Sequence, residues 1–202
     1  MWRRWEVELG QEVVLFHSVL GLRPAVGAFA DQLRAAGHTV HTPDLFDGEV
    51  FDSLEDGARK RDATGMGELM RRARVAVADL PAEIVLAGFS MGASTAEFLA
   101  ATRPGTRAAV LMHGAFAPAA FGIKTWPAVP VQLHYANGDP DVDIRQIRAL
   151  ETAVQQSGVS IAVFTYDGGG HLFEDAAFEG HDPVSAQLMC DRVLAFLDEL
   201  QD

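Results

Sequence analysis

Three side chains that could together perform nucleophilic catalysis stand out in the sequence: Ser90, Asp139 and His171. Ser90 is the centre of the pentapeptide GFSMG (88–92), which matches the G-x-S-x-G pattern of a nucleophile elbow. An apolar run (83–89) precedes the serine and a helix-forming segment follows it, so we expect a sharp strand-to-helix turn that exposes the hydroxyl. The alternative is a glycine-rich packing turn in which the serine only caps a helix.

A serine hydroxyl becomes a nucleophile at neutral pH when a base takes its proton and an acid orients that base. Asp139 follows an apolar run (131–137) that predicts a strand, and His171 follows another (159–166) after three glycines. The order serine, acid, histidine is the order found in α/β hydrolases. The carboxyl ends of parallel strands lie at one edge of the sheet, so the three side chains are expected to meet there.

Other carboxylates compete with Asp139 for the role of the acid. We favour Asp139 because it comes first after its strand and is followed by a proline that restricts the chain. Two of the competitors are typical first-turn helix acids, which stabilise the helix dipole. The competitors are Asp141, Asp143 and Asp167.

Strands and helices alternate along the chain. The expected strands are 12–18, 39–46, 83–89, 106–114, 131–137 and 159–166, and the expected helices are 24–38, 66–80, 91–102, 141–158 and 183–200. Such alternation with apolar strands predicts one α/β domain over residues 1–202, with a mostly parallel sheet covered by helices on both faces. Residues 47–64 are polar and aperiodic and predict an irregular surface excursion, and residues 3–9 are a further candidate edge strand.

Charge and composition narrow the classes of partner. The formal charge of −12 argues against nucleic acid and anionic membrane, because phosphate groups need a basic surface. No apolar run reaches the roughly 18 residues that cross a bilayer, and the charged start lacks the apolar segment of a signal peptide. The single cysteine, Cys190, lies in an apolar helical pattern and predicts a buried structural thiol in a reducing, cytoplasmic location.

Four segments resemble the dienelactone hydrolase family of the α/β-hydrolase superfamily. They are VVLFHSVLGLRPAVGAFADQLRAAGHTVHTPDLFDG (13–48), GFSMGAS (88–94), GDPDV (138–142) and GGGHLF (168–173). The resemblance extends over nearly the whole chain and implies an α/β hydrolase with Ser90, Asp139 and His171 as its triad. It also implies that the backbone amides of Met91 and Val19 form the oxyanion hole.

The chain departs from the best-known members of this family at positions that bear on the substrate. Those members carry cysteine where this chain has Ser90, and glutamate at the position of Ser18. Lactone-cleaving members also carry an arginine where this chain has Asp175, preceded here by Glu174. Because two acids would repel an anionic substrate, we expect a neutral or cationic ester rather than dienelactone itself.

Several further side chains are candidates for the substrate pocket. His17 and Ser18 end the first predicted strand, and Phe116 and Trp126 lie in the long loop after the fourth. Backbone hydrogen bonding by the histidine and core packing by the aromatic residues are the alternatives. His113 also ends a strand, but no H-x-x-x-H spacing accompanies it, so no metal site is expected.

The sequence therefore predicts a serine esterase that uses no cofactor and acts on a small, neutral ester. Two alternatives stay open. One is acyl transfer or thioester hydrolysis by the same triad, and the other is a ligand-binding protein on a hydrolase scaffold without turnover. The sequence carries no signal for the oligomeric state.

Overall fold

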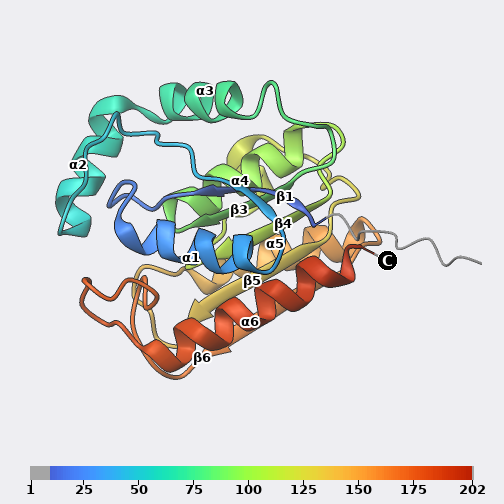
Figure 1. The fold of residues 1–202 in the computed structure, drawn as a ribbon. Helices are drawn as coiled ribbons and strands as arrows, with labels where there is room; N and C mark the ends of the chain where they lie inside the picture. Colours follow the sequence, from blue (N-terminus) through green and yellow to red (C-terminus); the bar gives the residue numbers. More distant parts are fainter. Residues whose placement is uncertain (1–9, 202) are drawn as a thin grey trace, which may run out of the picture.

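The computed structural model describes residues 10–201 and consists of alternating strands and helices (Figure 1). The strands are β1 (Glu12–Phe16), β2 (Thr39–His41), β3 (Val85–Phe89), β4 (Ala108–Met112), β5 (Val131–Ala136) and β6 (Ile161–Tyr166). The helices are α1 (Pro24–Ala35), α2 (Leu54–Thr64), α3 (Met66–Ala76), α4 (Met91–Thr102), α5 (Ile144–Gln156) and α6 (Pro183–Glu199), with a short 3₁₀ helix, η1 (Pro118–Phe121). The candidate edge strand at 3–9 lies outside the described residues.

All six described strands are parallel, in the order β2-β1-β3-β4-β5-β6, so the predicted α/β fold is confirmed. Alternate residues of β1 face opposite layers: Val13 and Leu15 pack with α1 and α6, whereas Val14 and Phe16 pack with α3, α4 and α5. Figure 1 shows α1 and α6 together on one side of the sheet. Both faces of the central strands are thus buried, which explains why these strands read as continuous apolar runs.

The excursion after β2 differs from the prediction, because residues 54–64 form helix α2 instead of irregular chain. Ser53 caps this helix by accepting from the backbone N–H of Asp56, and Gly65, with φ of +83°, ends it. Within α2 only Gly57 is buried, so the sequence has no apolar stripe from which this helix could be predicted. Gly57 packs so closely on the carbonyl oxygen of Val19 that a Cβ atom would overlap it.

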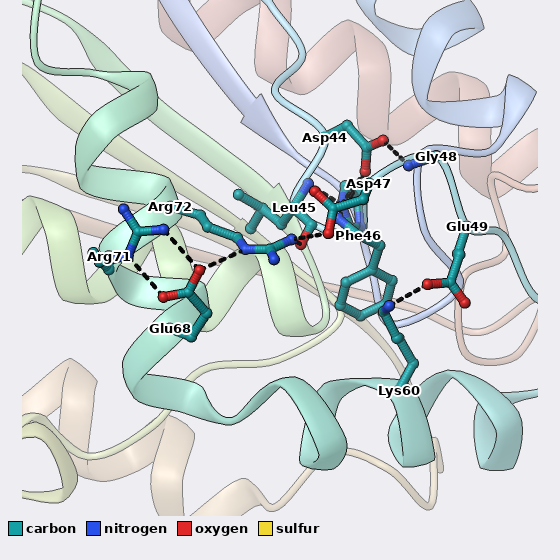
Figure 2. A network of polar contacts seen from close by, with 11 residues as sticks. Asp44, Leu45, Phe46, Asp47, Gly48, Glu49, Lys60, Glu68, Arg71 and Arg72 are labelled. Atoms are coloured by element: carbon teal, nitrogen blue, oxygen red, sulfur yellow. Dashed lines mark hydrogen bonds and ion pairs between the residues drawn. The ribbon is translucent and has the colours of Figure 1, made fainter.

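A polar network fixes α2 and α3 to the loop that follows β2 (Figure 2). Arg72 of α3 donates to the carbonyl of Leu45 (2.9 Å) and to Oδ2 of Asp47 (2.6 Å), while Lys60 of α2 pairs with Glu49. The backbone N–H of Leu45 in turn donates to Nε2 of His17, at the end of β1. The network therefore connects this helical cover to the sheet edge where the catalytic candidates lie.

The described residues bear on two expectations, the buried thiol of Cys190 and the lack of a membrane-spanning segment. Cys190 is buried on α6, and burial raises the pKa of its thiol to about 11, so the thiol stays protonated at neutral pH. In residues 10–201 no helix has both the length and the apolar character that a membrane crossing needs.

Candidate active site

Ser90 lies at the tight turn between β3 and α4. Its backbone has φ of +53° and ψ of −109°, a conformation that is costly for a residue with a side chain and that is typical of a nucleophile elbow. Gly88 and Gly92 make the turn possible: a Cβ atom on Gly88 would overlap the backbone of Gly92, and one on Gly92 would overlap the carbonyl of Phe16. The local sequence thus places a hydroxyl at the N-terminus of α4.

The structure brings Ser90, Asp139 and His171 together in one chain of hydrogen bonds. His171 Nε2 lies 2.9 Å from Ser90 Oγ, and His171 Nδ1 lies 2.8 Å from Asp139 Oδ2. Because an ionised Asp139 only accepts, Nδ1 carries the proton and Nε2 is free to accept from the serine. This is the geometry that a hydroxyl needs to become a nucleophile.

The competing acids lie elsewhere. Asp143 caps α5 by accepting from the backbone of Arg145, and Asp167 accepts from the side chain of Asn137. Asp141 contributes its backbone N–H, which donates to Oδ1 of Asp139 over 2.9 Å. Of the four candidate acids, Asp139 is the one that contacts the histidine.

The charge state of Asp139 results from two opposing effects. Burial acts to raise the pKa of this carboxyl, but the hydrogen bonds from His171 and from the backbone of Asp141 act to lower it. The net pKa lies below the ordinary aspartate value. Asp139 is therefore a carboxylate at neutral pH and can stabilise a positive charge that develops on the imidazole.

Two backbone amides, those of Met91 and Val19, are expected to form an oxyanion hole. Met91 and Val19 both line the cavity beside Ser90. In residues 10–201 neither amide has a hydrogen-bond acceptor, and Met91 is the first residue of α4, where helix amides are unpaired. The positions expected for an oxyanion hole are thus occupied by two free N–H groups.

His17 and Ser18 do not line the cavity, so the structure corrects their predicted placement in the pocket. His17 is completely buried; its Nδ1 donates to the carbonyl of Ser18 (2.7 Å) and its Nε2 accepts from Leu45. Ser18 Oγ accepts from the backbone of Leu20 over 3.1 Å. The polar groups of both side chains therefore bond to backbone atoms of this turn and of the loop after β2, and they stabilise the turn that contains Val19.

A cavity of about 590 Å³ opens beside the Ser90 hydroxyl. Its apolar walls come from the α2–α3 cover, from the loop after β4 and from the residues before α5. Apolar side chains from these segments include Leu54, Ala58, Met66, Phe116, Phe121 and Val142. Phe116 is in the wall as predicted, but Trp126 is not: its ring is buried in the core and its Nε1 donates to the carbonyl of Val129.

The two acids of the histidine loop do not face the cavity. Asp175 forms a buried ion pair with Arg23, whose Nε lies 2.6 Å from Oδ2. Glu174 Oε2 lies 2.6 Å from Nε2 of His113, at the end of β4. The argument that this pair of acids repels an anionic substrate therefore does not hold, since neither side chain lines the cavity and Asp175 is paired with Arg23.

One group of side chains has the donor set of a metal site. A ring nitrogen of His113, a carboxylate oxygen of Asp139 and a ring nitrogen of His171 lie within 4.8 Å of one another. Two of these residues already bond to each other within the hydrogen-bonded chain of Ser90. The absence of a metal stays a prediction.

The parallel sheet, the strained serine between β3 and α4, and the acid and histidine on the loops after β5 and β6 define an α/β hydrolase fold. The dienelactone hydrolase family model matches residues 6–201. The chain belongs to the dienelactone hydrolase family.

Solved structures with a similar fold carry hydrolase names. A dienelactone hydrolase-like promiscuous phosphotriesterase from metagenomic libraries aligns over 94% of this chain and 86% of its own, with 22% identity and a TM-score of 0.78. A putative dienelactone hydrolase from Klebsiella pneumoniae gives 17% identity over 94% and 87%, with a TM-score of 0.74. Esterase PE8 gives 21% identity over 95% and 93%, with a TM-score of 0.67. A comparison with curated proteins finds no significant match.

Proposed function

We propose that this chain is a serine hydrolase that cleaves a small, uncharged carboxylic ester through an acyl-enzyme. The observation that carries the proposal is the continuous hydrogen-bonded chain from Asp139 through His171 to the strained Ser90. Membership of a hydrolase family supports it. The alternative, in which Ser90 only caps a helix in a glycine-rich turn, would not require Asp139 and His171 to be hydrogen-bonded to it.

In the proposed first half-reaction, Ser90 Oγ bonds to the ester carbonyl carbon while its proton moves to His171 Nε2. The carbonyl electrons move to oxygen, and the resulting oxyanion accepts from the amides of Met91 and Val19. One such donor contributes about 3 kcal/mol to the stability of the transition state in comparable enzymes. Asp139 keeps the imidazole in the correct tautomer and stabilises its positive charge.

Collapse of this intermediate breaks the bond to the alkoxy oxygen, which takes the proton from His171 Nε2 and leaves as the alcohol. Water then repeats the attack on the acyl-enzyme: its proton passes to His171, and the acid and a protonated Ser90 are released. No cofactor is consumed in either half-reaction, since each proton that the histidine takes is returned.

The cavity supports an uncharged substrate. Apolar side chains supply much of the cavity wall, and of its four lining Arg and Asp side chains three, Arg61, Asp62 and Asp143, are in ion pairs. Arg61 Nε donates to Oδ1 of Asp62, and Asp143 pairs with Arg145. Such a site offers little free charge to bind an ionic group, so we assign it a neutral acyl chain.

The test is labelling with a fluorophosphonate together with hydrolysis of p-nitrophenyl acetate. We expect the wild type to be labelled at Ser90, and Ser90→Ala to lose labelling and at least about 10³-fold in kcat. Ser94→Ala is the matched control, because Ser94 also lines the cavity on α4 but donates to the Met91 carbonyl. An unlabelled wild type, or full activity in Ser90→Ala, contradicts the proposal.

Thioester and amide substrates of the same acyl chain distinguish the related reactions. Faster turnover of the thioester at equal acyl chain would favour the thioesterase alternative, and formation of a new ester from an added alcohol would favour acyl transfer. Binding of an ester without turnover would favour a ligand-binding protein.

A further inference from the structure

A second buried pair of an acid and an imidazole lies beside the first. His113 Nε2 and Glu174 Oε2 are 2.6 Å apart, and the side chains are 0% and 7% exposed. His113 ends β4, and Glu174 comes three residues after His171 in the same loop. The proposed mechanism uses neither of them.

His113 contacts the histidine of the first pair directly. Its ring lies edge-on to the His171 ring, with centroids 5.6 Å apart, and edge-on to Phe173 at 4.6 Å. One of its nitrogens lies within 4.8 Å of a carboxylate oxygen of Asp139 and of a ring nitrogen of His171. The second pair therefore lies against His171 in a buried space, where charges are weakly screened.

The hydrogen bonds of His113 indicate its protonation. Nε2–H donates to Glu174, while Nδ1 is buried and has no partner in the described residues. A second proton on Nδ1 would create a buried cation with an unused donor, which costs more than an unused lone pair. In this arrangement Nε2 is the ring nitrogen that bears hydrogen, and the charge that the pair brings to the site is the carboxylate of Glu174.

We propose that Glu174 and His113 form a positioning pair that holds the His171 loop and keeps the carboxylate of Glu174 close to the ring that takes the proton of Ser90. The inference rests on the proposed function, since it assigns His171 as the general base. When His171 accepts the proton of Ser90, the carboxylates of Asp139 and Glu174 both stabilise the imidazolium.

Other titratable groups face this cluster from the neighbouring strands. On β5, burial lowers the pKa of His134 to about 3, so this ring is uncharged near neutral pH. Behind it, Tyr166 bonds to His134 Nδ1, and Arg192 of α6 lies over the Tyr166 ring. The charged group nearest to His113 is therefore Glu174, and Asp139 is a second carboxylate close to it.

The experiment removes the charge of Glu174 with the variant Glu174→Gln, which keeps the size and shape of the side chain. For Glu174→Gln we expect the acid limb of the kcat/KM pH profile to move to lower pH by roughly 0.5–1 unit, because a nearby negative charge is lost. The NMR titration of the His171 imidazole is expected to move in the same direction. Glu179→Gln, an exposed residue of the same loop, is the matched control and leaves both midpoints unchanged.

Two further variants separate charge from structure. Glu174→Asp and His113→Gln both keep the negative charge, so both are expected to keep the wild-type midpoint even where kcat falls. If Glu174→Gln leaves the midpoint in place, the pair is only structural and the proposal is overturned. A midpoint raised in His113→Gln also overturns it, because His113 would then carry a positive charge.

Two controls keep the result interpretable. If Glu174→Gln does not fold, the double replacement of His113 by Phe and Glu174 by Leu fills the same space with apolar groups and carries the same prediction. The NMR titration needs no turnover, so a protein without esterase activity would refute the proposed function while still testing this pair.

Discussion

Arg23 Nε donates to Asp175 Oδ2 over 2.6 Å, and this ion pair joins the start of α1 to the loop that carries His171. Both side chains are only 8% exposed. The same guanidinium donates to the carbonyl of Phe51 (2.8 Å) and to the carbonyl of Ala177 (3.2 Å). One side chain therefore fixes the histidine loop to the segment that leads into α2, and with it two walls of the active site.

Arg23→Met is expected to reduce the free energy of unfolding by about 3 kcal/mol, because it leaves the Asp175 carboxylate buried without its partner. Esterase activity is expected to fall as well, since the loop that positions His171 is no longer fixed. Urea denaturation and kcat measure the two effects. Arg59→Met removes an exposed pair with Glu55 and is the control, with an expected change of about 0.5 kcal/mol or less. Equal effects of the two variants would contradict the role given to Arg23.

A buried carboxyl on α4 makes the stability depend on pH. Glu97 is completely buried, and its Oε2 accepts from the backbone N–H of Phe116 over 2.8 Å. Burial raises the pKa of Glu97 to about 8. Because the folded pKa lies above the unfolded value, the native state binds the proton more tightly, and stability is lost as the pH rises from about 4.5 towards 8.

Glu97→Gln is expected to remove this loss, because an amide stays neutral and its oxygen still accepts from Phe116. The variant should therefore be more stable than the wild type by roughly 2–4 kcal/mol at pH 8, with the difference shrinking towards pH 5. Urea titrations at several pH values measure it. Glu83→Gln is the exposed control. A pH-independent difference for Glu97→Gln would show that ionisation is not the cause.

Local patterns predicted the parts of the molecule that depend on neighbouring residues, such as the apolar strands and the glycines around Ser90. The order of Ser90, Asp139 and His171 was readable because each follows a strand of a parallel sheet. Helix α2 was missed because it has no apolar stripe and is held by capping, by ion pairs and by the contact of Gly57 with Val19.

The errors at the site have a common physical origin. The sequence shows that an aromatic or charged residue is present, but its partner is far away along the chain. Trp126 is apolar enough for either a pocket or a core, and its ring is buried in the core against residues from other strands and helices. Asp175 looked like a free charge because its partner, Arg23, lies 152 residues earlier.

Phe116 is expected to set the preference for the acyl chain. It is 45% exposed, lines the cavity and lies edge-on to Phe121 with ring centroids 5.9 Å apart. Phe116→Ala removes one apolar wall, so kcat/KM for p-nitrophenyl butyrate should fall by about 10-fold while that for the acetate changes little. Val184→Ala, an exposed residue of α6, is the control. A uniform fall for both esters would indicate a general disturbance of the site.

Gly92 and Gly67 provide a test of how tightly the nucleophile helix packs. Both are helical glycines, but a Cβ atom on Gly92 would overlap the carbonyl oxygen of Phe16, whereas nothing lies within 4 Å of one on Gly67. Gly92→Ala must push α4 away from β1 and is expected to cost about 3 kcal/mol of stability and most of the activity. Gly67→Ala should stabilise the protein by about 0.5–1 kcal/mol, because alanine has the higher helix propensity. Thermal and urea unfolding of the two variants measure the contrast, and a Gly92→Ala protein as stable and active as wild type would refute the close contact between α4 and β1.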